Sequence, residues 1–167
     1  MTPENVAVFR LLLPLLLAVS LLMPLTAGAS TDKAHAAYDA RNYRAAMRLY
    51  RPLAEDGNAE AQYYVGRMYE KGQGVRKDPA EGARWYRRAA EGGHAPAQYR
   101  LAVGYAFGLG GLKKDEEAAL KWLRRSAEGG YKRAQKVLGQ AYAEGRFGLP
   151  VDREQADYWT KRAEASS

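Results

Sequence analysis

The sequence of 167 residues predicts an all-α protein: an α-solenoid of helical hairpins, about eight helices after a signal peptide. Two observations predict this fold class. Apolar and small residues recur at helical spacing, and several residue types return together at steps of 36 and 37 residues. Several columns with one period are typical of an array built from one repeated supersecondary unit. The columns are Ala61-Gln62, Ala97-Gln98 and Ala134-Gln135; Tyr69, Tyr105 and Tyr142; Gly72, Gly108 and Gly145; Asp78, Asp115 and Asp152; Trp85, Trp122 and Trp159.

The first element is a targeting segment, residues 1–29. A lead that ends in Arg10 precedes an apolar run from Leu11 to Leu25, and Ala27-Gly28-Ala29 offers the small residues that a signal peptidase requires. The run holds roughly 15 apolar residues, whereas a bilayer span needs about 20. We therefore expect cleavage after Ala29, an exported protein and no stable membrane span in the mature chain. An uncleaved membrane anchor is the alternative.

The second element is a divergent first hairpin, residues 30–57. Its expected helices are 33–40 and 43–55, and Tyr43, Ala46 and Tyr50 resemble the second helix of a repeat unit. Pro52 lies near the end of that helix, where it removes one backbone donor and is expected to bend the chain.

Three full units follow, at residues 58–93, 94–130 and 131–167. In the first of them, Ala61, Val65 and Met68 share one helical face. Gly72 suits a left-handed cap at the end of this first helix, and Trp85 is expected to anchor the second helix. Where the two helices cross, small residues recur: Gly66, Ala102 and Gly139.

The second helices have their own start signal. Asp78 suits the N-cap, and Glu81 three residues later predicts a capping box, a pattern that Asp152 and Gln155 repeat. In the last of these helices three columns become polar together, at Asp157, Thr160 and Glu164. A terminal repeat has no neighbour on its outer face, so we expect this helix to cap the array and the chain to be complete there.

The segment from Asn58 to Ser167 resembles the Sel1-like repeat family, relatives of tetratricopeptide repeats. The motifs that carry the resemblance are AEAQYYVGRMYEKGQGVRKDPAEGARWYRRAAEGG and its two later copies. Ala102 in a glycine column, the extra Gly104 and Gly111, and Pro150 depart from the pattern without threatening the fold. The resemblance implies an α-solenoid that binds other proteins, as an adaptor, scaffold, regulator or secreted factor of bacterial envelopes.

Composition and residue inventory argue against catalysis. The chain has no cysteine, which excludes disulfides, thiolate metal sites and cysteine nucleophiles. Ser126 lies in the column of Ala89 and Ala163 and is expected to be a packing residue. His35 and His94 lie in different units without an i, i+4 partner, so we expect no metal site, no cofactor and no catalytic residue. We expect His94, at the entry to a first helix, to serve as a cap or a surface residue.

By analogy with tetratricopeptide repeats, the first helices line a concave groove that binds a partner protein or peptide. The side chains that this analogy places there are aromatic or cationic, of kinds enriched at interfaces. Arginine and lysine favour a partner with carboxylates. The candidate partner-binding residues are Tyr63, Tyr64, Arg67, Lys71, Tyr99, Arg100, Phe107, Arg133, Lys136 and Gln140. In the alternative interpretation the tyrosines pack and the charges are solvated.

The net charge of +7 has a second source in the second helices. Arg87-Arg88, Arg124-Arg125 and Lys161-Arg162 each follow the tryptophan by two and three residues. They either cover apolar surface with their stems or attract an acidic envelope polysaccharide or peptidoglycan. Export makes nucleic acid an unsuitable partner. We expect an adaptor, scaffold or regulator in the periplasm, with secretion as the alternative localisation.

Overall fold

The computed structural model describes residues 24–165, and within them it contains eight α-helices and no strand. In chain order the helices are α2 (Pro24–Asp39), α3 (Tyr43–Glu55), α4 (Ala59–Lys71), α5 (Pro79–Glu91), α6 (Ala95–Phe107), α7 (Glu116–Glu128), α8 (Lys132–Glu144) and α9 (Arg153–Ala165). The predicted all-α solenoid is confirmed. Most of the predicted signal peptide lies outside the described residues.

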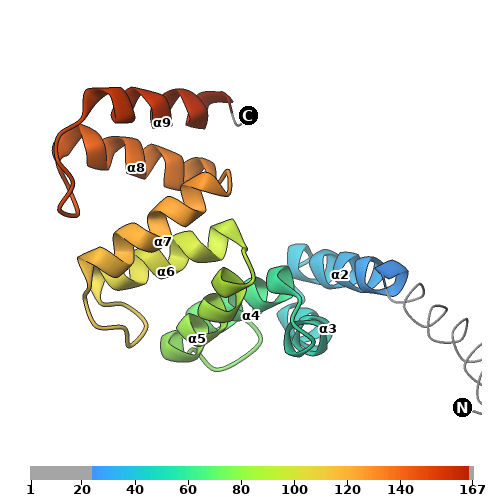
Figure 1. Cartoon of the computed structure of the whole chain (residues 1–167). Coiled ribbons are helices and arrows are strands. Elements are labelled where there is room, and N and C mark those ends of the chain that lie inside the picture. Colours follow the sequence, from blue (N-terminus) through green and yellow to red (C-terminus); the bar gives the residue numbers. More distant parts are fainter. Residues whose placement is uncertain (1–23, 166–167) are drawn as a thin grey trace, which may run out of the picture.

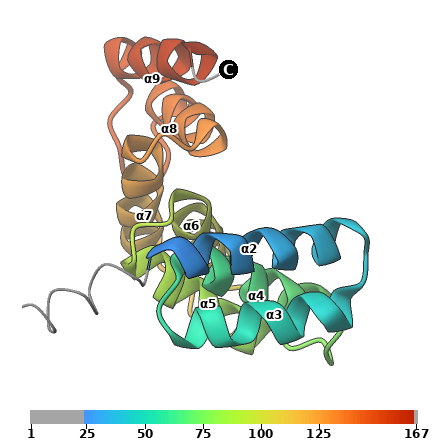
Figure 2. The same cartoon turned by 90° about the vertical axis from the view of Figure 1, so that its right-hand side faces the viewer.

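The helices form four hairpins that stack in chain order, with α2 at one end of the array and α9 at the other (Figures 1 and 2). The main contacts join helices that are consecutive in the sequence, which is the packing of a solenoid. None of the described helices is long and apolar enough to cross a membrane. The helix α2 begins earlier than expected, at Pro24, so the predicted cleavage point after Ala29 lies inside it.

Both predicted kinds of helix end are present. Gly72, Gly108 and Gly145 end α4, α6 and α8 in the left-handed conformation, with φ of 71°, 68° and 68°. At the other end, the carboxylates of Asp78, Asp115 and Asp152 accept hydrogen bonds from backbone N–H groups three residues on. Each cap satisfies backbone groups that a helix leaves unpaired. The caps therefore fix the residues at which the helices end and begin.

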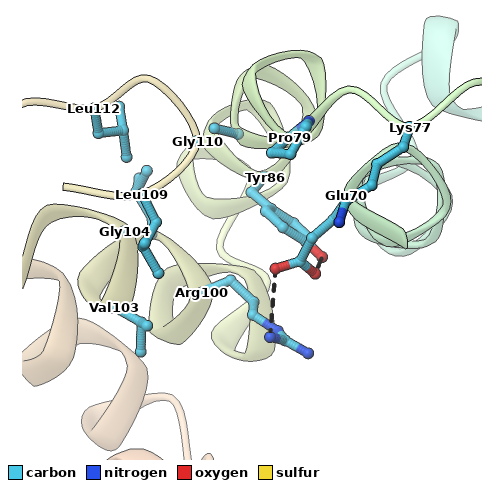
Figure 3. Close-up of a pocket in the computed structure, with 12 residues that line it drawn as sticks. Glu70, Lys77, Pro79, Tyr86, Arg100, Val103, Gly104, Leu109, Gly110 and Leu112 are labelled. Carbon is cyan, nitrogen blue, oxygen red and sulfur yellow. Dashed lines mark hydrogen bonds and ion pairs between the residues drawn. The ribbon is translucent and has the colours of Figure 1, made fainter. Parts of the chain in front are cut away.

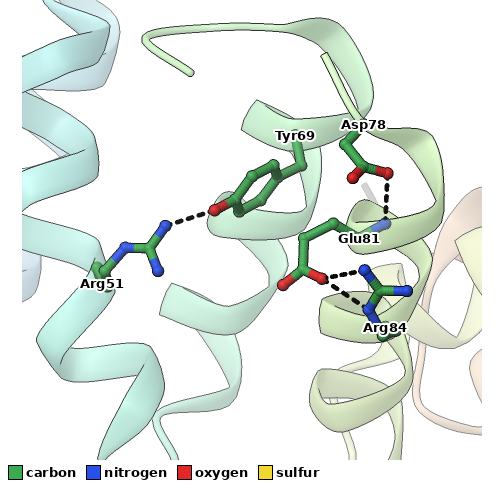
Figure 4. A network of polar contacts seen from close by, with 5 residues as sticks. All are labelled: Arg51, Tyr69, Asp78, Glu81 and Arg84. Carbon is green, nitrogen blue, oxygen red and sulfur yellow. Dashed lines mark hydrogen bonds and ion pairs between the residues drawn. The ribbon is translucent and has the colours of Figure 1, made fainter. Parts of the chain in front are cut away.

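The predicted capping box is only half formed, because the side chain three residues after the N-cap does not accept the hydrogen bond from the N-cap N–H. The backbone N–H of Asp78 donates to the carbonyl of Tyr69 on α4, 2.9 Å away, and the carboxylate of Glu81 instead binds Arg84 (Figure 4). Asp152 likewise donates to the carbonyl of Tyr142. The N-cap N–H therefore ties the second helix to the first helix of its own hairpin, and no donor is left for the side chain at the third position.

Three buried glutamines join each first helix to the hairpin before it. The side-chain amide of Gln62 donates to the carbonyl of Ala54 at 3.0 Å, and Gln98 and Gln135 donate to Ala90 and Ala127 at 3.1 Å. Each acceptor lies in the last turn of the preceding second helix, where carbonyls lack helical partners. The Ala-Gln column of the sequence is therefore an inter-repeat connection.

A second repeated connection joins arginine to tyrosine across the repeats. Arg51 donates to the hydroxyl of Tyr69 (Figure 4), and Arg87 and Arg124 donate to Tyr105 and Tyr142 at 3.0 and 3.2 Å. Each pair spans 18 residues, from a second helix to the next first helix. The tyrosine column thus also serves the packing of the array.

The last helix has the predicted polar face. Asp157, Thr160 and Glu164 are exposed on α9, whereas Leu123 and Ala127 on α7 occupy two of the same columns and are buried. On its inner side α9 buries Trp159, which is 7% exposed. A helix without a neighbour on one face must be polar there to stay soluble, and α9 meets that condition.

Candidate partner-binding face

The predicted groove residues come from α4, α6 and α8, and we call the surface that these helices expose the first-helix face. Residues of these three helices meet at two cavities, one between α4 and α6 and one between α6 and α8. Val103 on α6 lines both cavities, so they lie on neighbouring sides of this helix. Of the predicted residues, Arg100 lines the first cavity, and Tyr99, Phe107 and Gln140 line the second.

At the end of the face near α2, Arg67 is surrounded by tyrosines. Its guanidinium carbon lies 5.4 to 5.7 Å from the ring centres of Tyr38, Tyr63 and Tyr64. Tyr64 also stacks on Tyr50, with ring centres 4.9 Å apart. These contacts place Arg67 and Tyr64 in the packing between α2, α3 and α4. Their role in binding stays a prediction.

The first cavity, which we call the polar junction, has a volume of 340 Å³ and lies between α4, α5 and α6 (Figure 3). Glu70 on α4 is one of the residues that line it. One carboxylate oxygen accepts a hydrogen bond from Tyr86 at 2.7 Å, and the other lies 3.7 Å from a guanidinium nitrogen of Arg100. Because Glu70 already engages both groups, Arg100 is held in place by its own repeat array.

The electrostatics of the polar junction follow from burial and from these contacts. Burial and the hydrogen bond to Glu70 raise the pKa of Tyr86 far above its ordinary value. Burial alone would lower the pKa of Arg100, but Tyr86, Glu70 and Tyr63 together raise it. Near neutral pH, Arg100 is therefore a cation and Tyr86 a neutral hydrogen-bond donor.

The second cavity, which we call the apolar junction, has a volume of 220 Å³ and lies between α6, α7 and α8. It occupies the same place one repeat later: Ala106, Leu123 and Val137 stand in the columns of Glu70, Tyr86 and Arg100. An adjoining hollow of 280 Å³ shares Phe107 and Phe147 with it. The predicted residues Tyr99, Phe107 and Gln140 line this cavity, and Phe107 is 68% exposed.

The remaining predicted residues are distributed along the same face. Tyr99 contacts Tyr131 with ring centres 5.3 Å apart. Burial and Tyr63 raise the pKa of Tyr131, whereas Arg133 and Arg100 lower it, so these groups lie within electrostatic reach of one another. Arg133 and Lys136 are exposed on α8, as is Lys71 at the end of α4. In the described part of the chain, Arg133 and Lys136 form no ion pair.

Sequence reasoning missed two residues of the face. Tyr131 stands at the N-cap position of α8 but makes no side-chain cap bond there, and its ring contacts Tyr99. Phe147 lines the apolar junction and stands in a column where the earlier units have Gly74 and Gly110. That exchange of glycine for phenylalanine was visible in the sequence and could have drawn attention to the apolar junction.

The cationic pairs of the second helices have packing partners. Arg87 and Arg124 bind tyrosines of the next repeat, as described above. The second member of each pair lies over the tryptophan of its own helix: Arg88 over Trp85 at 4.6 Å, Arg125 over Trp122 at 5.0 Å and Arg162 over Trp159 at 5.4 Å. Such cation–π contacts stabilise the helix surface and account for the repetition of these pairs.

The residues considered for chemistry have structural contacts. Ser126 is fully buried and its hydroxyl donates to the carbonyl of Ala95 at 2.6 Å. His94 caps α6, since its Nδ1 accepts from the backbone of Ala97 at 3.3 Å. Burial lowers the pKa of His94, which keeps it neutral and able to accept this bond. Among residues 24–165, no group of three or more His, Asp or Glu side chains is placed to hold a metal ion.

Comparison with known proteins confirms the predicted resemblance to the Sel1-like repeat family. The Sel1 repeat family model matches residues 39–58, 59–94, 95–131 and 132–166. A Sel1 repeat protein from Oxalobacter formigenes has a similar crystal structure, with a TM-score of 0.76 and 33% identity over 82% of this chain and 56% of that chain. A protective antigen of uropathogenic Escherichia coli strains displaying an SLR fold has a TM-score of 0.67 and 37% identity.

The second of these alignments covers 75% of this chain and 26% of the antigen. The chain thus spans about half of the first solved protein and about a quarter of the second. No curated protein matches the sequence. The shared repeat architecture is therefore established, while the larger proteins contain regions that have no counterpart here.

Proposed function

The chain belongs to the Sel1 repeat family, and we propose that it is an exported, non-enzymatic adaptor or regulator that binds a partner protein through its first-helix face. Sel1 repeat proteins generally mediate protein–protein interaction, which supports the general part of this proposal. The signal peptide predicted at residues 1–29 supports export to the periplasm, with secretion as the alternative. A solenoid fold alone does not determine a function, which depends on the side chains that its surface presents.

The observation that carries the proposal is a difference between two kinds of column. The columns that connect repeats keep one residue type, as glutamine does at Gln62, Gln98 and Gln135. The columns of the first-helix face change from repeat to repeat: Tyr63, Tyr99 and Lys136; Tyr64, Arg100 and Val137; Arg67, Val103 and Gln140. Tyr64, Arg67 and Arg100 are engaged by contacts within the array. By contrast, Lys136 and Gln140 in the same columns are exposed on α8 and are available to specify a partner.

The chemistry of the face supports a protein partner with acidic side chains. Arg133 and Lys136 are exposed on α8, and Tyr99 and the exposed Phe107 lie on α6, the preceding first helix. Aromatic and arginine side chains carry much of the energy at protein interfaces, and cations there select carboxylates. The alternative, an acidic polysaccharide or peptidoglycan, depended on the second-helix cations, and these contact tyrosine and tryptophan instead.

The proposal is tested by quantitative capture from envelope extract. Arg133→Glu with Lys136→Glu reverses two charges on the first-helix face, and Lys121→Glu with Arg153→Glu reverses two exposed charges on second helices as the matched control. We expect a partner that the wild type enriches to be lost with the first pair and kept with the second. Equal capture by both pairs would contradict binding through the first-helix face.

A further inference from the structure

The apolar junction contains a residue whose backbone conformation needs an explanation. Phe147 has a φ of 55°, a left-handed conformation that costs roughly 1–2 kcal/mol for a residue other than glycine. The equivalent residues are Gly74 and Gly110, with φ of 72° and 63°. The third unit therefore keeps the turn of the other two but places a large aromatic ring in it. Such outliers recur at binding sites, where the surrounding structure maintains the strain.

The two glycines show what the ring at this position changes. A Cβ on Gly74 would lie 2.6 Å from the backbone of Tyr43, and one on Gly110 would lie 2.9 Å from the carbonyl of Pro79. In those units the loop packs directly on the first residue of the preceding second helix. In the third unit the equivalent residue is Glu116, which lines the hollow together with Phe147. The ring of Phe147 thus stands where the other two units have close packing between a loop glycine and the backbone, and the cavity lies beside this ring.

The cavity is apolar where its predecessor is polar. Ala106, Leu123 and Val137 replace the carboxylate, hydroxyl and guanidinium of the polar junction. Tyr99, Phe107 and Phe147 add aromatic walls, and Phe107 is largely exposed to water. At 220 Å³ the cavity is smaller than the roughly 300 Å³ at which pockets for whole small molecules begin. Its size and lining suit one bulky apolar side chain.

The surroundings of the cavity specify the charge of its occupant. Arg146 lines the cavity, Lys114 lines the adjoining hollow, and Arg133 and Lys136 lie farther along α8. The acids nearby are Glu116 and Glu144, which pair with Lys114 and Arg146 at 3.1 and 3.5 Å. Arg133 and Lys136 are left as two cations with no ion pair among the described residues. The complementary ligand carries carboxylates beside its apolar side chain.

From this arrangement we infer that the apolar junction between α6 and α8 binds a segment of the partner protein that carries one bulky apolar residue next to acidic residues. This inference rests on the proposed function and narrows it to one anchor site. On α8, Arg133 and Gln140 are two turns apart, about 10 Å at 1.5 Å per residue. An extended peptide covers that distance in about three residues. The expected motif therefore has an acidic residue two to four positions from the apolar one.

The test is a selection of random 12-residue peptides displayed on phage against the purified protein, followed by fluorescence anisotropy with the selected peptides. We expect the selected peptides to share a Phe, Leu, Ile or Trp with Asp or Glu two to four positions away. Phe147→Gly restores the glycine of the other units and should weaken binding at least tenfold. Ala106→Glu, which introduces the residue of the polar junction, should do the same.

The control is Val151→Ala, because Val151 is 64% exposed in the same loop but does not line the cavity. It should leave the affinity unchanged, and circular dichroism should show all three variants folded. Peptides whose affinity is unaffected by Phe147→Gly and Ala106→Glu but is lost with Arg133→Glu and Lys136→Glu would overturn the anchor site and leave the proposed function standing. If no peptide is selected, both are contradicted.

Discussion

The polar and apolar junctions are the same piece of architecture with opposite chemistry. Each lies between two successive first helices and the second helix that joins them, and each is held by a buried glutamine and an arginine–tyrosine pair. In one, Glu70 binds Tyr86 and Arg100; in the other, the same columns hold Ala106, Leu123 and Val137. The comparison teaches that the array is stabilised by a few repeated contacts, while the cavities between repeats are free to differ.

The largest expected effect concerns the loop of the polar junction. Gly110→Ala adds a Cβ 2.9 Å from the carbonyl of Pro79 at a φ of 63°. Left-handed strain and overpacking together should lower the free energy of unfolding by about 2 to 4 kcal/mol. In the apolar junction, Phe147→Gly should change it by less than about 1 kcal/mol, since relieved strain offsets lost ring contacts. Urea denaturation of both variants measures the difference, and equal losses would show that the two loops do not differ.

The next effect tests what the junctions share. Gln98→Ala and Gln135→Ala each remove a side-chain donor from the carbonyls of Ala90 and Ala127, which keep the backbone N–H groups of Gly93 and Gly130 as their other donors. Each should lower the unfolding free energy by about 0.5 to 1.5 kcal/mol, the net contribution of one hydrogen bond, and the two losses should agree within about 0.5 kcal/mol. Chemical denaturation of the two variants measures this. A loss at one junction without a loss at the other would mean that the glutamines are not a common framework.

A smaller effect tests whether Glu70, Tyr86 and Arg100 stabilise one another in the polar junction. Ala106→Glu alone puts a carboxylate among apolar groups and should cost about 1 kcal/mol, reduced by the openness of the cavity. Adding Leu123→Tyr and Val137→Arg recreates the partners that Glu70 has in the polar junction. We expect the triple variant to recover most of the loss, as coupled neighbours do. Strictly additive losses would contradict the equivalence of the two junctions.

The smallest effect is a pH dependence at the entry to α6. Burial lowers the pKa of His94 in the folded protein. Below about pH 6.5, His94 therefore binds a proton more readily in the unfolded chain than in the folded one. Stability therefore falls as the pH falls from 7 towards the folded-state pKa. His94→Asn copies Asn58, the cap of α4, and should remove this part of the pH dependence. Thermal melts at pH 7.5 and 5 compare the two proteins, and an unchanged dependence would exclude His94 as its source.

The sequence was sufficient for the fold because repeat columns and caps are local signals. Glycine at Gly72 and aspartate at Asp78 act within one turn of the chain, and the structure has them where the pattern predicts. The capping box failed because the N–H of Asp78 is taken by Tyr69, a contact between helices. Local pattern predicts which groups need a partner, but tertiary contacts decide which partner they find.

The candidate face was harder to predict because it depends on which side chains are already engaged. Arg67 was grouped with Arg133 as a cation for ligand binding, but tyrosine rings surround the first and leave the second exposed. The constant spacing between Arg87 and Tyr105 could have revealed the inter-repeat pair, since it recurs in Arg124 and Tyr142. The cavities themselves arise only when helices from two units pack together.

Site-specific photo-crosslinking in the native cell tests the central claim most directly. A photoreactive residue at Gln140, which lines the apolar junction, is compared with one at Lys121, which is exposed on the second helix α7. The account predicts a crosslinked partner from position 140 that disappears with Phe147→Gly, and none from position 121. The same crosslinked partner from both positions, or from position 121 alone, would contradict binding through the first-helix face.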